Sequence, residues 1–425
     1  MSTLILIIFI GGYLLIASEH LIKINKAATA LITGVLCWVA YVVFSSDHHL
    51  VADQLTEHLG ELSGILFFLL SAMTIVELID QHDGFNIITE RIRNRDKRRL
   101  LWIISFLTFF LSAILDNLTT TIVLISLLRK IMKDEKDRLY FAGIVIIAAN
   151  AGGAWSPIGD VTTTMLWIGG QITAFKIITK LILPSLICLI VPLVLVSFRM
   201  KGTVERPEDL RTDGKALPVL HQKIILFSGI AVLISVPVFK TLTGLPPYMG
   251  ILLGLGIIWI ITEILHRSKD DEEKRSFTVV NALRKIDIST ILFFLGILIA
   301  ISAMQSTGIL TKLSDSLAKS VNNQSVIVIS IGLISSIVDN VPLVAAAQGM
   351  YDLVQYPTDH YFWEFLAYCA GTGGSALIIG SAAGVAAMGM EKINFFWYVK
   401  HITWLALLGF FSGAFFYILQ DMVLK

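Results

Sequence analysis

Charged residues are scarce in this sequence. Only 15% of its 425 residues are charged, whereas 55% are hydrophobic, and the mean hydropathy is +0.78. This composition excludes an ordinary soluble globular domain. Apolar runs long enough to cross a bilayer recur from one end to the other. The composition therefore predicts an all-α polytopic membrane protein.

Three further features are absent or rare. The three cysteines, Cys37, Cys188 and Cys369, lie singly in apolar runs, which excludes a disulfide framework and a thiolate metal site. No Gly-x-x-x-x-Gly-Lys-Ser/Thr loop is present, so nothing indicates ATP use. No histidine lies deep in an apolar run beside a nucleophile, as a membrane-embedded hydrolase would need. We expect a protein that is not an enzyme, needs no cofactor and depends on an ion gradient.

The basic residues are unevenly placed between the apolar runs. About ten spans are expected, at 3–17, 26–44, 62–80, 139–168, 175–198, 222–239, 247–265, 288–305, 362–388 and 395–420. With both termini placed outside, 27 of the 33 Lys and Arg residues fall on the cytoplasmic side. The segment 45–61, which has no Lys or Arg, becomes an outer loop.

Two matching strings, Asp116-Asn117 and Asp339-Asn340, carry the only charged side chains of the apolar runs 100–128 and 320–351. Two arms of about 14 residues reach only about 21 Å each, short of the roughly 30 Å bilayer core. Basic residues flank both ends of 100–128 but are few beside 320–351. We expect two re-entrant helical hairpins with the Asp-Asn pairs at their tips, the first opening to the cytoplasm and the second outward. A single long tilted span is the alternative for 100–128.

The two strings belong to an internal repeat. They are 223 positions apart, and two glycine-rich segments, Ala149–Gly153 and Ala370–Gly374, are 221 positions apart. The charge pattern gives the two halves opposite orientations, which is the inverted-repeat plan of secondary transporters. The expected organisation is N-terminal scaffold helices at 1–60, a first repeat at 61–198, a linker with two connecting spans at 199–287, and an inverted second repeat at 288–425.

In each repeat a glycine-rich segment interrupts a span, at 139–168 and at 362–388. Gly152, Gly153, Pro157 and Gly159 break the first of these helices. Backbone that is freed from helical bonding at this depth must be buried in protein or line a cavity. Close packing of helices through small residues is the alternative explanation of the glycines. We favour a binding site.

The polar residues expected near the bilayer midplane are hard oxygen donors, which suit hard cations. They are Asp116, Asn117, Asn150, Asp160, Thr162, Thr163, Asp339 and Asn340, supported by Ser112, Ser335, Thr372 and Ser375. A buried carboxylate that binds either a proton or a cation would couple their movement in opposite directions. Glu77, about one turn inside its span, is a candidate for a proton route or a pH response.

Four stretches resemble the NhaD-type sodium/proton antiporters of the ion transporter superfamily. They are Ser71–Glu77, Ser112–Thr120, Asn150–Thr163 and Ser336–Pro342. The resemblance implies Na+ or Li+ export in exchange for H+, with the eight residues above as ion and proton residues and Na+ at Asp116, Asp160 and Asp339. It also implies a homodimer with an elevator-like cycle, in a bacterial inner membrane or a chloroplast envelope. The start of the chain is not like a transit peptide, which favours the bacterial membrane. The partners expected are these ions and the lipid bilayer, with no nucleic acid.

Two other transporters of the same superfamily remain as alternatives. Sodium-coupled dicarboxylate or citrate symporters tend to carry Ser-Asn-Thr at the hairpin tips, where this chain has Asp116 and Asp339. An anionic substrate would meet unfavourable charge here, and Asp160 adds a third acid. An arsenite-type efflux carrier moves an uncharged substrate and gives no need for three acids.

Overall fold

The structure is a computed structural model that describes the chain except for residues 90–91, 93, 206–217, 268–273, 322 and 425. The described elements are helices, apart from an isolated bridge between Asp96 and Thr203. Eight helices of the described part are long and apolar enough to cross a membrane. The fold class predicted from the composition, an all-α polytopic membrane protein, is confirmed.

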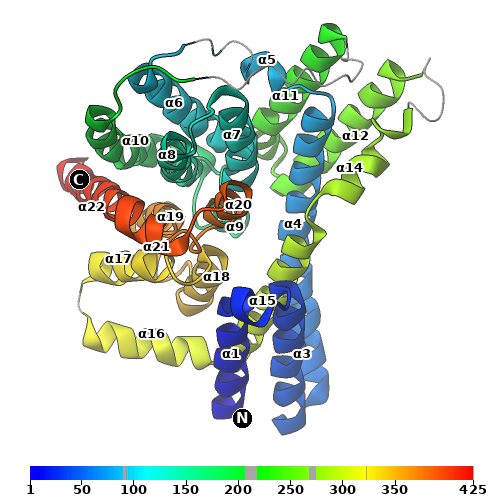
Figure 1. Cartoon of the computed structure of the whole chain (residues 1–425). Coiled ribbons are helices and arrows are strands. Elements are labelled where there is room, and N and C mark those ends of the chain that lie inside the picture. Colours follow the sequence, from blue (N-terminus) through cyan, green and yellow to red (C-terminus); the bar gives the residue numbers. More distant parts are fainter. Residues whose placement is uncertain (90–91, 93, 206–217, 268–273, 322, 425) are drawn as a thin grey trace.

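One group of helices, here called the scaffold helices, is built around the long helix α4, which crosses most of the height of the molecule (Figure 1). The scaffold helices are α1 (Ser2–Ala17), α3 (Lys26–Phe44), α4 (His48–Gln81), α11 (Val219–Thr243), α12 (Pro247–Leu265) and α15 (Ile288–Ser306). Short helices α2 (Glu19–Ile22), α5 (Asn86–Thr89), α14 (Val279–Lys285) and α16 (Ile309–Ser320) connect them to their neighbours. Helix α3 packs along α15, and α12 packs along α4. Each of these pairs joins one half of the chain to the other.

Helix α4 contradicts one expectation. The segment 45–61 was expected to be an outer loop, but α4 begins at His48 and runs unbroken through it. The Asp47 side chain caps the helix by accepting a hydrogen bond from the Leu50 N–H, at 3.0 Å. Between this cap and Gly60 the segment contains neither glycine nor proline. Nothing therefore interrupts a helix that is polar at its start and apolar further on.

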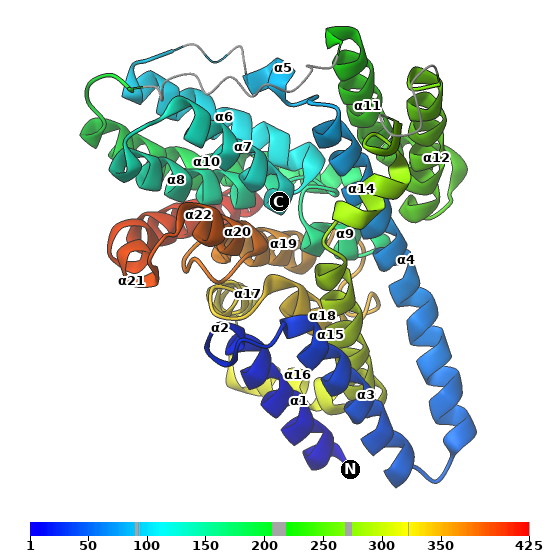
Figure 2. The ribbon, with the colours of Figure 1, turned by 45° about the vertical axis from the view of Figure 1, so that its right-hand side comes forward.

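The second group, here called the core bundle, holds both interrupted spans (Figure 2). From the first half it contains α6 (Lys97–Leu115), α7 (Asn117–Ile131), α8 (Glu135–Ala154), α9 (Val161–Ile168) and α10 (Ala174–Arg199). From the second half it contains α17 (Gln324–Ile334), α18 (Asn340–Met350), α19 (Tyr361–Gly373), α20 (Ala382–Glu391), α21 (Phe395–Tyr398), a π-helical turn (Val399–Thr403) and α22 (Trp404–Leu424). Helix α7 packs on α20 and α18 packs on α9, so the halves interlock here as well.

The Asp-Asn strings lie between pairs of helices. Helix α6 ends at Leu115 and α7 begins at Asn117, with Asp116 between them at a φ of 120°. Asp339 caps α18 in the second pair. Helix α6 is longer than the expected arm, because its 19 residues span about 28 Å and begin at Lys97, within the basic segment. That either pair is re-entrant in a membrane stays a prediction.

Candidate functional site

Asp160 lies at the centre of a buried polar network, where the first interrupted span resumes as α9. Its side chain caps α9 by accepting hydrogen bonds from the Thr162 N–H at 2.9 Å and the Thr162 hydroxyl at 2.8 Å. The Asn117 amide donates a third bond, at 2.7 Å. Asp160 is only 2% exposed, so these contacts replace its hydration.

The asparagines of both strings converge on this carboxylate. Asn117 begins α7, and Asn340 begins α18. The Asn340 Nδ2 atom lies 3.4 Å from each Asp160 carboxylate oxygen, which is long for a hydrogen bond. The structure thus brings the two strings, 223 positions apart, together around one acid.

Asn150 links this acid to the second interrupted span. Its side-chain oxygen accepts a hydrogen bond from Asn117 at 3.0 Å. Its nitrogen donates to the hydroxyls of Ser375 and Ser381, both at 2.9 Å. The sequence reasoning did not select Ser381 as a site residue. The signal was available, because Ser381 follows Asp160 by the repeat offset of 221 positions and caps α20 as Asp160 caps α9.

Two serines expected in supporting roles fix the hairpin helices to the interrupted spans. The Ser112 hydroxyl donates to the Ala149 carbonyl at 2.6 Å, and the Ser335 hydroxyl donates to the Ala370 carbonyl at 3.0 Å. The other two candidates with hydroxyls bond to nearby backbone. Thr163 donates to the Asp160 carbonyl at 2.9 Å, and Thr372 donates to the Tyr368 carbonyl at 2.6 Å.

The remaining two acids, Asp116 and Asp339, do not join the network. Asp116 accepts hydrogen bonds from the Thr119 N–H at 2.7 Å and the Thr119 hydroxyl at 2.8 Å. Asp339 caps α18 and pairs with Lys26, whose Nζ atom lies 3.4 Å from Oδ2. In the described part of the chain no three His, Cys, Asp or Glu side chains are close enough to share a metal ion. Each of the three acids caps a helix of its own, and a sodium site shared by Asp116, Asp160 and Asp339 stays a prediction.

Glu77 has partners of its own near the end of α4. It accepts a hydrogen bond from Gln81 at 3.3 Å and forms an ion pair with Lys285 of α14, at 3.4 Å. Within the described part of the chain, no hydrogen bond or ion pair joins Glu77 to the network around Asp160. Its role in a proton route or a pH response stays a prediction.

A cavity of about 720 Å³ separates the scaffold helices from α9 and α18. Met165 of α9 and Ala345 of α18 lie on its core-bundle side, and Gln305 lies on its scaffold side. Glu57 and Glu61, from the segment expected outside, are also part of its wall. Helix α9, which Asp160 caps, and helix α18, which begins at Asn340, therefore border a cavity shared with the scaffold helices.

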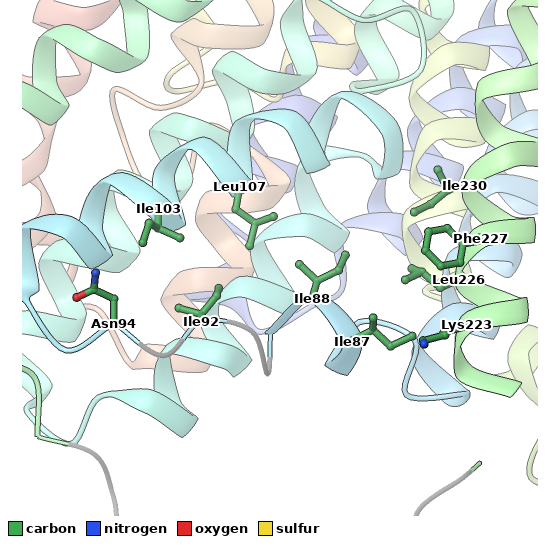
Figure 3. Close-up of a pocket in the computed structure, with 10 residues that line it drawn as sticks. All are labelled: Ile87, Ile88, Ile92, Asn94, Ile103, Leu107, Lys223, Leu226, Phe227 and Ile230. Atoms are coloured by element: carbon green, nitrogen blue, oxygen red, sulfur yellow. The ribbon is translucent and has the colours of Figure 1, made fainter. Parts of the chain in front are cut away.

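A second cavity, of about 800 Å³, lies apart from this network (Figure 3). Residues of α5, α6, α11 and the segment between α5 and α6 form it, and most of them are apolar. Lys223 and Asn94 are the polar side chains in its lining. Neither Asp160 nor its hydrogen-bond partners border this cavity.

Two interrupted helices that meet at a buried polar centre are the architecture of ion-coupled secondary transporters. The sequence profile of a family described as citrate transporter matches residues 5–363. Sodium/proton antiporter 2 of Arabidopsis thaliana is 47% identical, over 96% of this chain and 97% of its own length. Sodium/proton antiporter 1 of the same plant is 48% identical, over 95% of this chain and 69% of its own length. The Na(+)/H(+) antiporter NhaD of Vibrio cholerae is 31% identical, over 95% of this chain and 89% of its own length. The chain belongs to the NhaD-type sodium/proton antiporter family, and it is a multi-pass membrane protein.

Proposed function

We propose that this protein exports Na+ or Li+ in exchange for protons, and that cation and proton compete for the Asp160 carboxylate. The observation that carries this proposal is the surroundings of Asp160. Its side-chain hydrogen-bond partners among the described residues, Asn117, Thr162 and Asn340, are neutral. Within the described residues no Lys, Arg or His forms an ion pair with it.

A buried carboxylate of this kind needs a counter-charge. An ionised acid inside a membrane protein is costly unless it is paired or neutralised. One bound proton neutralises Asp160, and one bound monovalent cation does the same. The two cannot occupy the same carboxylate oxygens together, so each must leave before the other binds. Exchange in opposite directions follows from that competition.

The amide side chains next to Asp160 can contact it both when it binds a proton and when it binds a cation. Asn117 and Asn340 direct their nitrogen atoms at Asp160. An asparagine also has a carbonyl oxygen, and rotation of the amide would direct that oxygen at a cation. With the Thr162 hydroxyl, these groups supply the hard oxygen ligands that Na+ and Li+ prefer.

Movement of the core bundle against the scaffold helices is the access step that we propose. The network lies within the core bundle, while the cavity of about 720 Å³ is bordered by both groups of helices. An elevator-like shift at this boundary would carry Asp160 from one side of the membrane to the other. We further propose a homodimer, held by its scaffold helices, in a bacterial inner membrane with both termini outside. The concentration of Lys and Arg in the expected cytoplasmic loops supports that orientation.

Sodium-coupled uptake of a carboxylate is the second candidate, because the matching profile is that of a citrate transporter. The charge of the site disfavours binding of a carboxylate substrate. Asp160 occupies the centre where a carboxylate substrate would have to bind, and like charges in a buried site repel strongly. Lys26, a basic side chain that contacts the second string, already pairs with Asp339.

The test measures collapse of a pH gradient in everted membrane vesicles from a host without its own Na+/H+ antiporters. Addition of Na+ or Li+ should collapse the gradient, whereas K+ or citrate alone should not. Asp160→Asn should reduce the Na+ response to the level of vesicles without the protein, because an amide cannot exchange a proton for a cation. Asp134→Asn, at the exposed cap of α8, is the matched control and should retain the response. Full activity of Asp160→Asn would refute the mechanism, and a response to citrate with Na+ but not to Na+ would support the symporter.

A further inference from the structure

Lys26 places a positive charge against the tip of the second hairpin. Its Nζ atom lies 3.4 Å from Asp339 Oδ2, and the side chains of the pair are 28% and 18% exposed. The same ammonium lies 4.3 Å from the centre of the Phe293 ring, on α15. The cation is thus held between a partly exposed acid and the ring of a buried phenylalanine.

The position of Lys26 in its own helix gives no reason for this charge. Lys26 is the first residue of α3, where the helix dipole disfavours a cation. The cap of α3 is provided by Asn25, whose side chain accepts a hydrogen bond from the Ala27 N–H at 2.8 Å. The lysine side chain is therefore free to serve the contact with Asp339.

That contact joins the two groups of helices. Lys26 belongs to the scaffold helix α3, and Asp339 caps the core-bundle helix α18. Helix α18 also packs against α15, which carries Phe293. Any movement of the core bundle against the scaffold must therefore separate or carry this ion pair.

The repeat itself does not require the pair. The matching acid, Asp116, accepts its hydrogen bonds from Thr119. Helix α12, which precedes α15 along the chain as α3 precedes α4, begins at Pro247. Lys26 is thus a specific addition at one of two equivalent tips.

We propose that Lys26 is a built-in counter-cation that competes with the transported Na+ for Asp339. When Asp339 Oδ2 joins Asp160 as a ligand of the transported Na+, the ammonium leaves the Asp339 carboxylate and keeps its proton, and α18 is released from α3. When Na+ leaves, the ammonium returns and holds the core bundle against the scaffold. This inference rests on the proposed Na+/H+ exchange and adds a residue that sets its apparent affinity for Na+.

Two measurements test the competition in the full-length protein. The first is the Na+ concentration that gives half-maximal exchange in everted vesicles, and the second is the Na+ concentration that gives half-maximal thermal stabilisation of the purified protein. Lys26→Gln should lower both by about three- to five-fold, since the pair is partly exposed. In an Asp339→Asn background the same change should have no effect on the stabilisation midpoint, because the acid for which the ions compete is gone.

The controls separate competition from a structural role. Lys23→Gln removes a nearby exposed lysine and should leave both midpoints unchanged. Lys26→Arg keeps the charge and binds a carboxylate more strongly through its planar guanidinium, so it should raise both midpoints, which is decisive even if Lys26→Gln fails to fold. Unchanged midpoints in Lys26→Gln, or in Lys26→Arg where only that variant folds, would overturn the inference while leaving wild-type exchange intact. Absence of a Na+ response in the wild type would instead overturn the proposed function.

Discussion

The two halves of the core bundle have the same arrangement of helices but different side chains at their centres. In each half a serine of the first hairpin helix bonds to a carbonyl of the interrupted span, Ser112 to Ala149 and Ser335 to Ala370. At the next contact Gly152 approaches the Phe109 carbonyl, and Gly373 approaches the Gly332 carbonyl. The repeat offsets relate all these residues. The helix contacts that surround the site therefore occur once in each half of the core bundle.

The side chains at its centre are not duplicated. The first half has Asp160 and Asn150, where the second half has Ser381 and Gly371. Asn150 reaches across to Ser375 and Ser381, so the second half provides neutral hydroxyls to the network. The difference favours the proposed single site centred on the Asp160 carboxylate over two equivalent sites.

The acids at the two hairpin tips, Asp116 and Asp339, also have different partners. Asp116 is satisfied within its own helix by Thr119. Asp339 is tied to the scaffold by Lys26. The acid of the second tip thus already has a cation, whereas that of the first tip has hydrogen-bond donors only.

Neutralising each tip acid is the strongest test of this difference. We expect Asp116→Asn and Asp339→Asn to abolish Na+-dependent collapse of the pH gradient, because the family resemblance makes both of them ion or proton residues. Their thermal unfolding should differ. Asparagine can cap α7 as aspartate does, so Asp116→Asn should unfold near the wild-type temperature. Asp339→Asn leaves Lys26 without its acid and should lose up to about 1 kcal/mol.

The unfolding midpoint in detergent distinguishes the two variants, and exchange in vesicles shows whether both acids are needed. Exchange that persists in both variants would restrict the ion-binding role to Asp160. Equal midpoints would show that the pair of Lys26 with Asp339 contributes nothing to stability.

Much of this arrangement could be predicted from single features of the sequence. Asp116 and Asp339 stand out because each is the one charge in a long apolar run, and Gly152 to Gly159 mark a helix break by local preference alone. The convergence of Asn117 and Asn340 on one centre follows from the repeat, because they occupy equivalent positions in the two halves. The pair of Lys26 with Asp339 does not, because its members are 313 positions apart and Lys26 lies outside the repeat. The local geometry that turns Asp116 towards Thr119 depends on a φ of 120°, which no sequence pattern indicated.

The glycine contacts give a smaller, symmetric prediction. A Cβ atom at Gly152 or Gly373 would lie within 3.0 Å of a carbonyl oxygen of the neighbouring helix, so the backbone would have to move. Gly152→Ala and Gly373→Ala should each lower the free energy of unfolding by about 1–3 kcal/mol. Gly256→Ala is the control, because no atom lies within 4 Å of its Cβ position, and it should be neutral or stabilising by up to about 1 kcal/mol. A large loss in one half only would show that the two contacts are not equivalent.

The two serines give the smallest effect and the finest test of the comparison. Ser112→Ala and Ser335→Ala each remove one hydrogen bond from a hydroxyl to a backbone carbonyl, so each should cost about 1 kcal/mol of stability with exchange retained. Ser63→Ala is the control, because that exposed hydroxyl bonds within its own helix, to the Gly60 carbonyl. Thermal unfolding and the Na+ dependence of exchange are measured on the same preparations. If both serines only hold the helices together, neither change should move the Na+ midpoint. A shift in Ser112→Ala alone would identify Ser112 as a ligand of the ion, and the asymmetry of the two halves would then extend from the interrupted spans into the hairpins.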